Sequence, residues 1–380
     1  MFKTVLLLWS SFSLILTTCF LTKEATLEMG RNGMEVIGEE QWTKEVDRRL
    51  FEQLKDLEKA LAGNKIWKGY SYQAYPQYLV HRDAANQLDR GFLINPVRIP
   101  PSAIRLSRKE SMGLDVWRYD GHLAKADVAL FGPFSNELFE FDLLIGNVEY
   151  YLQVYTDDLS RDSEDPTQTV SFSVHENFHR YQNKWEWVPE AQQDFRNFPV
   201  LQNLLELQIL CQEITKDLPL EKLSKKQSRD LLEQYLAIRT EEINLDSTAG
   251  RLIKNHELYQ EQMEGSARYI ETMASLAVFD KDSFPSTFGY SLFEFHVTNK
   301  DEVRGIVGQT VYYGTGASAI YLLDRLGYPI EEMEQGKTPY DLAKKYLALS
   351  PQQMRQALAR AKSIPNWAAI QKLAAEWANY

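Results

Sequence analysis

The residues of this chain best suited to chemistry are two histidines that flank a glutamate: His175, Glu176 and His179. On a helix, positions i and i+4 face the same side one turn apart, so both imidazoles could bind one zinc ion. Glu176 would then reach a zinc-bound water and act as the general base of a hydrolysis. The simpler alternative is a helix that carries incidental histidines on its polar face.

A stripe of apolar residues supports a packed helix around this HExxH motif. Val170, Val174, Phe178 and Tyr181 recur at spacings of four, four and three residues, which is typical of the buried face of a helix. Because a metal site needs a rigid, dry frame, this stripe favours the functional interpretation of the two histidines.

A catalytic zinc ion takes three protein ligands and leaves one position for water. The downstream candidates are Glu186, Glu190, Glu206, Glu213, Glu257, Glu261, Glu264, Glu271 and His256, together with the downstream aspartates. Gly265 singles out the segment 261–271, because a glycine inside a helix costs about 1 kcal/mol relative to alanine. Such a glycine is useful where another backbone must come close, as when two helices converge on one metal ion.

Charged residues recur beside Gly265 as one stripe of the same predicted helix: Glu257, Glu261, Glu264, Arg268 and Glu271. The alternative interpretation of such a stripe is a solvated helix face.

The two motifs together resemble the gluzincin metallopeptidases, in particular the peptidase MA-like branch, in which HExxH is followed by a helical Glu-Gly-x-Ala-x-Tyr-x-Glu. The resemblance covers residues 170–275 and implies a zincin-like fold. It implies His175, His179 and Glu264 as ligands of one catalytic Zn²⁺, with Glu176 as general base and acid and Glu271 in a supporting role. It also implies a peptide or protein substrate. The interval between His179 and Glu264 is longer than in many relatives, and we interpret residues 182–255 as inserted helices.

The pattern of helices and strands expected around these residues predicts an α+β protein. Residues 24–160 form an N-terminal α+β region, with a helix over 39–61 and a small mixed sheet that includes strands at 66–70 and 148–154. Residues 161–380 form a predominantly helical, zincin-like catalytic region that contains the inserted helices.

Residues 1–23 have the pattern of an export segment, with Lys3 ahead of an uncharged apolar run. Leu16-Thr17-Thr18-Cys19 resembles a bacterial lipobox, although Thr18 stands where Gly, Ala or Ser is expected. A lipoprotein anchored through Cys19, an uncleaved membrane anchor, ordinary secretion and a buried N-terminal helix are the alternatives. We expect an extracytoplasmic protein, periplasmic, on the cell surface or secreted, that contacts the membrane only through this segment.

Composition narrows the range of partners. The net charge of −11 disfavours binding to nucleic acid and to anionic lipid surfaces. The two cysteines are Cys19 and Cys211, so the body of the protein beyond the export segment cannot form an internal disulfide by itself.

No motif identifies the residue that would stabilise the oxyanion. The candidates are Tyr312, Tyr313, His296, His256 and Arg268, and Tyr313 is the first choice because it precedes a Gly-rich turn. That turn, residues 314–319, fits the loose fingerprint G-x-G-x-x-A after a predicted strand at 305–313. It lacks the second strand with an acidic end that a dinucleotide site requires, so close helix packing is the better interpretation.

We therefore expect a zinc metallopeptidase. The alternative is a catalytically inactive, zincin-like surface lipoprotein that binds a partner or a glycan, and the intact Glu176 counts against it. A nicotinamide-dependent enzyme would depend on residues 314–319 alone.

Overall fold

The computed structural model describes residues 42–63, 65–132, 142–159, 170–186, 195–218, 222–279 and 287–380. Two compact units make up this chain. The first contains the described residues up to Ala62 and those of Ser71–Ser173, and the second contains those of Gly63–Tyr70 and Val174–Tyr380. The export segment expected at 1–23 lies outside the described residues. In the parts that are described, no helix is long and apolar enough to cross a membrane.

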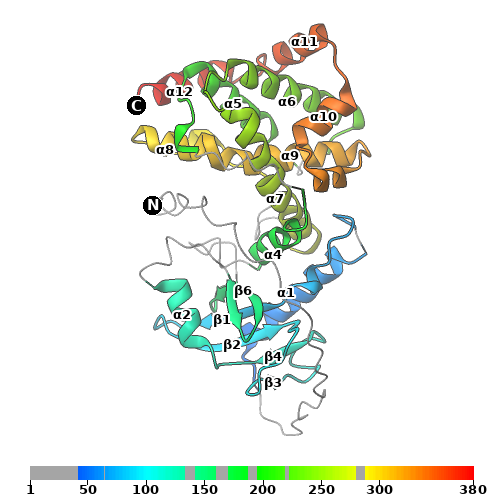
Figure 1. The fold of residues 1–380 in the computed structure, drawn as a ribbon, viewed down its shortest axis with the longest axis vertical. Helices are drawn as coiled ribbons and strands as arrows, with labels where there is room; N and C mark the ends of the chain where they lie inside the picture. Colours follow the sequence, from blue (N-terminus) through cyan, green and yellow to red (C-terminus); the bar gives the residue numbers. More distant parts are fainter. Residues whose placement is uncertain are drawn as a thin grey trace. The chain divides into compact units, whose positions relative to one another are not determined.

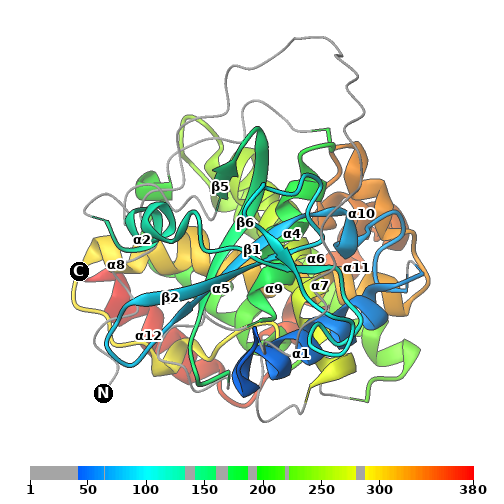
Figure 2. The same cartoon turned by 90° about the horizontal axis from the view of Figure 1, so that it is seen from below.

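The described residues of the first unit form a twisted mixed sheet with the helices α1 and α2 (Figures 1 and 2). Its elements are α1 (Glu45–Leu61), β1 (Gln77–Arg82), β2 (Leu88–Ile94), β3 (Ile104–Arg105), β4 (Val116–Arg118), α2 (Leu123–Phe131), β5 (Asp142–Ile145) and β6 (Val148–Tyr155). The strand order is β3-β4-β2-β1-β6-β5, and only the β1–β6 pairing within this sheet is parallel. The predicted strand at 148–154 is confirmed as β6, and the predicted helix at 39–61 is confirmed over its described part as α1.

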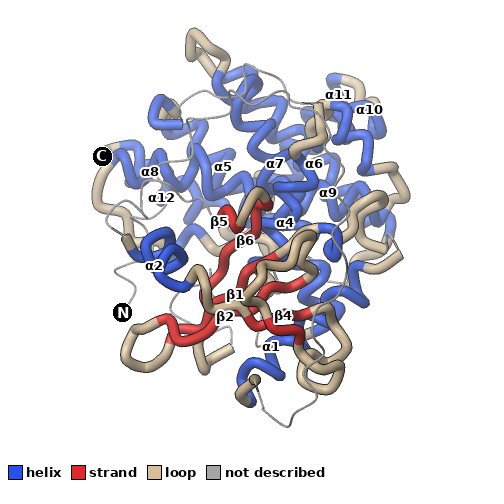
Figure 3. Tube along the Cα trace, turned by 60° about the horizontal axis from the view of Figure 1, so that its bottom comes forward, coloured by secondary structure: helices blue, strands red, loops and turns tan. Residues whose placement is uncertain are grey.

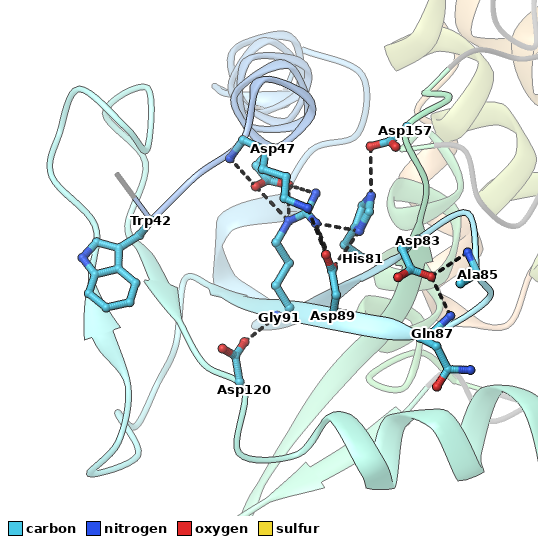
Figure 4. Close-up of polar contacts among 12 residues, drawn as sticks. Trp42, Asp47, His81, Asp83, Ala85, Gln87, Asp89, Gly91, Asp120 and Asp157 are labelled. Atoms are coloured by element: carbon cyan, nitrogen blue, oxygen red, sulfur yellow. Dashed lines mark hydrogen bonds and ion pairs between the residues drawn. The ribbon is translucent and has the colours of Figure 1, made fainter. Parts of the chain in front are cut away.

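A buried ionic cluster ties α1 to this sheet (Figure 4). Arg90 on β2 pairs with Asp47 on α1 at 2.9 Å, and both side chains are buried. The hydroxyl of Tyr155 on β6 also donates to Asp47, at 2.6 Å. His81 lies between Asp89, 2.7 Å from Nδ1, and Asp157, 3.1 Å from Nε2. Because a buried charge is tolerated only when it is paired and hydrogen-bonded, the contacts of Asp47 with Arg90 and Tyr155 fix the position of α1 on the sheet.

The second unit is helical, and every strand described in the protein lies in the first unit (Figure 3). Its helices are α4 (Phe172–Gln182, which begins two residues before this unit), α5 (Gln202–Thr215), α6 (Lys225–Leu245), α7 (Leu258–Val278), α8 (Lys300–Gly305), α9 (Val311–Arg325), α10 (Pro339–Leu347), α11 (Pro351–Ala361) and α12 (Trp367–Ala378). Single π-helical turns, Ile253–Glu257 and Ile306–Thr310, lead into α7 and α9. The chain is therefore an α+β protein, as the sequence predicts.

Local sequence signals set several helix ends in this unit. Ser224, Thr338 and Ser350 each accept from the backbone of the third helical residue, which closes a capping box at the start of α6, α10 and α11. The helices α5 and α6 fall in the segment 182–255, where inserted helices were expected. The helix α6 ends at Leu245, ahead of the π turn that leads into α7.

Two predicted strands are wrong. Residues 65–70 form turns and not a strand, since Gly69 adopts φ 90°, a left-handed conformation that interrupts extended backbone. Residues 305–313 are helical, from the end of α8 through a π turn into α9. Their β-branched and aromatic residues suggested a strand, but a short apolar run is equally compatible with a helix that is buried on most sides. Without that strand, the dinucleotide fingerprint at 314–319 loses its structural context.

Candidate metal centre

Helix α4 carries the HExxH motif, and it presents the two histidines on one side. The ring centroids of His175 and His179 lie 4.8 Å apart. The opposite side is held by aromatic packing within the second unit, where the ring of Phe178 lies 5.1 Å from Trp67 and 5.0 Å from Tyr70. The stripe predicted from the sequence is confirmed, because Val170, Val174, Phe178 and Tyr181 are all buried. Apolar packing therefore fixes the helix that bears the histidines.

Helix α7 lies beside α4 (Figure 1), and it brings Glu264 to the two histidines. Its Oε2 atom lies 3.4 Å from Nε2 of His175 and 3.2 Å from Nε2 of His179. Ligand atoms bound at about 2.0–2.1 Å to a tetrahedral zinc ion stand about 3.3–3.4 Å apart. The same Oε2 atom is buried and makes no well-oriented hydrogen bond with the protein. The donor set and its spacing therefore fit a zinc ion.

Glu271, about two turns further along α7, supports His175. Its Oε2 atom lies 3.2 Å from Nδ1 of His175. Arg268 donates to the same oxygen at 3.2 Å, and it also donates to the carbonyl oxygens of Thr287 and Phe288. Since a carboxylate only accepts, this contact places a hydrogen on Nδ1 and leaves Nε2, which faces Glu264, as the nitrogen that can bind a metal ion.

Two further side chains complete the site. Glu176 is half-buried, and its carboxylate lies with ring nitrogens of His175 and His179 in a group whose ligand atoms are all within 4.8 Å of one another. Tyr313 on α9 stacks on the ring of His175, with centroids 5.9 Å apart and planes at 10°. The hydroxyl of Tyr313 is hydrogen-bonded to Glu264.

The ionisable groups of this centre perturb one another strongly. Burial alone would lower the pKa of His175, but hydrogen bonds to Glu264 and Glu271 raise it to about 10. Burial opposes the charged form of His179 as well, yet the charge of Glu264 raises its pKa. Burial would raise the pKa of Glu264, but the two imidazoles lower it far below its usual range. Burial and the charge of Glu264 together raise the pKa of Tyr313. The centre therefore stabilises the ionised form of Glu264 and a positive charge next to it.

The structure brings together every site residue predicted from the sequence, namely His175, Glu176, His179 and Glu264, with Glu271 and Tyr313 beside them. The other carboxylates of the charged stripe on α7 are not part of this centre, because Glu261 pairs with Arg239 and Glu257 lies beside that arginine. The alternative of a solvated face is wrong, since all four glutamates of the stripe are buried.

Gly265 permits a close helix contact, as predicted, but the backbone that approaches it belongs to α9. A Cβ atom on Gly265 would lie 2.7 Å from the Cα atom of Gly316. A Cβ atom on Gly316 would in turn lie 2.6 Å from the carbonyl oxygen of Glu261. Gly316 therefore serves the packing of α9 on α7, and this packing sets Tyr313 beside Glu264.

Gln182 also belongs to the centre, although no sequence motif points to it: its Oε1 atom lies 2.6 Å from Nδ1 of His179. Its spacing of three residues from His179 places both on one face of α4 and was the available signal. Comparisons with protein-family models, with curated proteins and with solved structures gave no match. The geometry of the centre is therefore the basis on which a function can be proposed.

Proposed function

We propose that this protein is a zinc-dependent metallopeptidase of zincin-like fold that acts outside the cytoplasm. His175, His179 and Glu264 would hold one zinc ion. The observation that carries the proposal is the approach of a buried carboxylate oxygen, which makes no well-oriented hydrogen bond, to two imidazole nitrogens at 3.4 Å and 3.2 Å. Three groups of this kind, drawn from two helices, are the usual ligands of a catalytic zinc ion.

Each residue around the centre would have a separate role in hydrolysis. A zinc ion held there would supply a water of lowered pKa and would polarise the scissile carbonyl group. Glu176 removes the proton from the attacking water and delivers it to the leaving amine. Tyr313 donates a hydrogen bond to the carbonyl oxygen as negative charge develops on it. Glu271 and Arg268 hold the ring of His175 in its orientation.

Glu176 separates this proposal from its alternative, an inactive zincin-like surface lipoprotein that binds a partner or a glycan. Loss of the general base is the simplest route to an inactive relative, and here the base is present at the centre. The extracytoplasmic location and the peptide or protein substrate are parts of the same proposal. They depend on the export pattern of residues 1–23 and on the resemblance to gluzincins.

Metal content of the purified full-length protein is the first test, with His175→Ala as the control. We expect about one zinc ion per chain in the wild type, removable by a chelator, and little in the control, because one of three ligands is missing. A folded wild-type protein that takes up no zinc would contradict the proposal.

Glu176→Gln then distinguishes a base from a ligand. As a base, Glu176 can be replaced without loss of zinc, while hydrolysis of a peptide library falls by about 10²–10⁴-fold. Zinc loss in Glu176→Gln would instead make Glu176 a ligand. A wild-type protein that binds zinc and cleaves no peptide would favour the binding lipoprotein.

A further inference from the structure

We propose that Gln182 is a positioning residue that fixes the tautomer and orientation of His179, and that helix α7 holds the Gln182 amide in the orientation this requires. The inference rests on the proposed function and extends it to a residue that would touch neither metal nor substrate. Helix α7 would then orient both imidazoles, and it also carries Glu264.

The orientation of the Gln182 amide follows from its contacts with α7. One end of the amide lies 2.7 Å from the carbonyl oxygen of Met263 and 2.7 Å from the hydroxyl of Ser266. A backbone carbonyl oxygen can only accept a hydrogen bond, so the group that faces it must be the NH₂ group. The hydroxyl of Ser266 donates to the carbonyl oxygen of Gln262 at 2.5 Å, and it is therefore free to accept from Gln182.

The tautomer of His179 follows from that orientation. The opposite end of the amide is its oxygen, which lies 2.6 Å from Nδ1 of His179. An amide oxygen only accepts, so Nδ1 must carry a hydrogen, which leaves Nε2 as the nitrogen that can bind a metal ion. Nε2 is the atom that lies 3.2 Å from Oε2 of Glu264. A flipped amide would set the oxygen of Gln182 against the carbonyl oxygen of Met263, which is electrostatically unfavourable.

Both histidines are therefore oriented from the same helix, by different chemistry. Glu271 on α7 accepts from His175 as a charged carboxylate. Gln182 accepts from His179 as a neutral amide that α7 locks in place. Partners of this kind fix a ligand ring and raise its basicity, and their loss typically costs 10–100-fold in metal affinity.

Zinc affinity of the full-length Gln182→Met variant tests the inference, measured by competition with a chelator for Zn²⁺. The matched control is Gln262→Met, because Gln262 is a buried glutamine whose NH₂ group also donates to a backbone carbonyl, that of Met333 at 2.7 Å, without touching an imidazole. We expect a 10–100-fold weaker affinity in Gln182→Met and no more than a threefold change in Gln262→Met. The absorption bands of bound Co²⁺ should shift only in Gln182→Met, since they report the ligand field.

If the wild type binds zinc and Gln182→Met binds it equally well, the inference is overturned while the proposed function stands. The same conclusion follows if both Met variants lose affinity equally. A wild type that binds no zinc overturns the proposed function as well.

Discussion

At the residue scale, the centre consists of acceptors that face one another. Oε2 of Glu264 is close to Nε2 of both histidines, while the Nδ1 atoms are occupied by Glu271 and Gln182. Such an arrangement is favourable only when a cation lies among the acceptors, and the raised pKa values of His175 and His179 have the same origin. A metal ion and protons therefore compete for one place, so that zinc binding should release protons.

Tyr313→Phe tests whether a hydroxyl at the centre acts on the substrate. The hydroxyl is bonded to Glu264, and the ring stacks on His175, so the variant keeps the packing and loses only the donor. We expect turnover at saturating zinc to fall by about 10²–10³-fold, because a donor to the developing oxyanion is lost. Zinc affinity should change by less than tenfold. Kinetics on a cleaved peptide and chelator competition measure the two quantities.

Tyr321→Phe is the matched control, because Tyr321 lies on the same helix and packs against Phe288. Its turnover should equal that of the wild type. If the turnover of Tyr313→Phe at saturating zinc equals that of the wild type, the Tyr313 hydroxyl supports Glu264 and does not act on the substrate.

At the element scale, the centre depends on the close contact of α7 with α9 at Gly265. Gly265→Ala places a methyl group 2.7–3.0 Å from backbone atoms of Gly316 and Ala317, which cannot move aside as a side chain could. The helices must separate, and we expect a loss of about 1–3 kcal/mol in the free energy of unfolding, despite the higher helix propensity of alanine. Zinc affinity should fall as well, since Glu264 is the adjacent residue.

Gly305→Ala on α8 is the control for this substitution, because a Cβ atom there meets nothing within 4 Å. Denaturant unfolding should find it as stable as the wild type or more stable by up to about 1 kcal/mol. A Gly265→Ala variant with wild-type stability would contradict this prediction, because α7 and α9 could then separate without loss of free energy of unfolding.

Helical periodicity made part of this site predictable. The face shared by His175 and His179, and the stripe that packs behind them, both follow from the 3.6-residue repeat of α4. Glu264 could be chosen from many carboxylates because Gly265 signalled a close backbone and because the second motif resembles a family. Nothing in the spacing indicated that the approaching helix is α9.

Contacts between helices made the rest unpredictable. Gln182 acquires its role only when α7 supplies Met263 and Ser266, far away in sequence. The charged stripe of α7 resembled a solvated surface because sequence alone does not indicate which partner helices bury it. Residues 305–313 resembled a strand for the same reason, since burial on most sides removes the periodicity that distinguishes the two structures.

At the scale of the whole molecule, the helical unit contains a buried charge network separate from the metal centre. Arg239 on α6 donates to Glu242 at 2.7 Å and to Glu261 on α7 at 2.7 Å. It also donates to Gln208 on α5 and to Thr315 on α9. One guanidinium thus joins four helices at the centre of the unit. The carboxyl of Glu257 lies near the same guanidinium, so the negative groups outnumber it.

This excess of buried acid makes stability depend on pH. Burial raises the pKa of Glu242 to about 7, against the attraction of Arg239, while the unfolded chain has a pKa of about 4.3. A group with a raised folded pKa contributes its full stability below the unfolded pKa, and it loses that contribution as pH rises through the folded pKa. The loss therefore falls between about pH 4.5 and pH 7, and it amounts to roughly 3 kcal/mol.

Glu242→Gln should remove this pH dependence, because glutamine keeps an acceptor for Arg239 and does not titrate. Denaturant unfolding at pH 5 and pH 8, with a chelator present, should give a wild type that loses on the order of 3 kcal/mol more than the variant over this interval. Glu233→Gln is the control, since Glu233 lies on the same helix and pairs with Arg229 and Arg360 near the surface. If Glu242→Gln and the wild type have parallel pH profiles, Glu242 is ionised at pH 5 in the folded protein, and Arg239 then compensates the buried acids more completely than its geometry suggests.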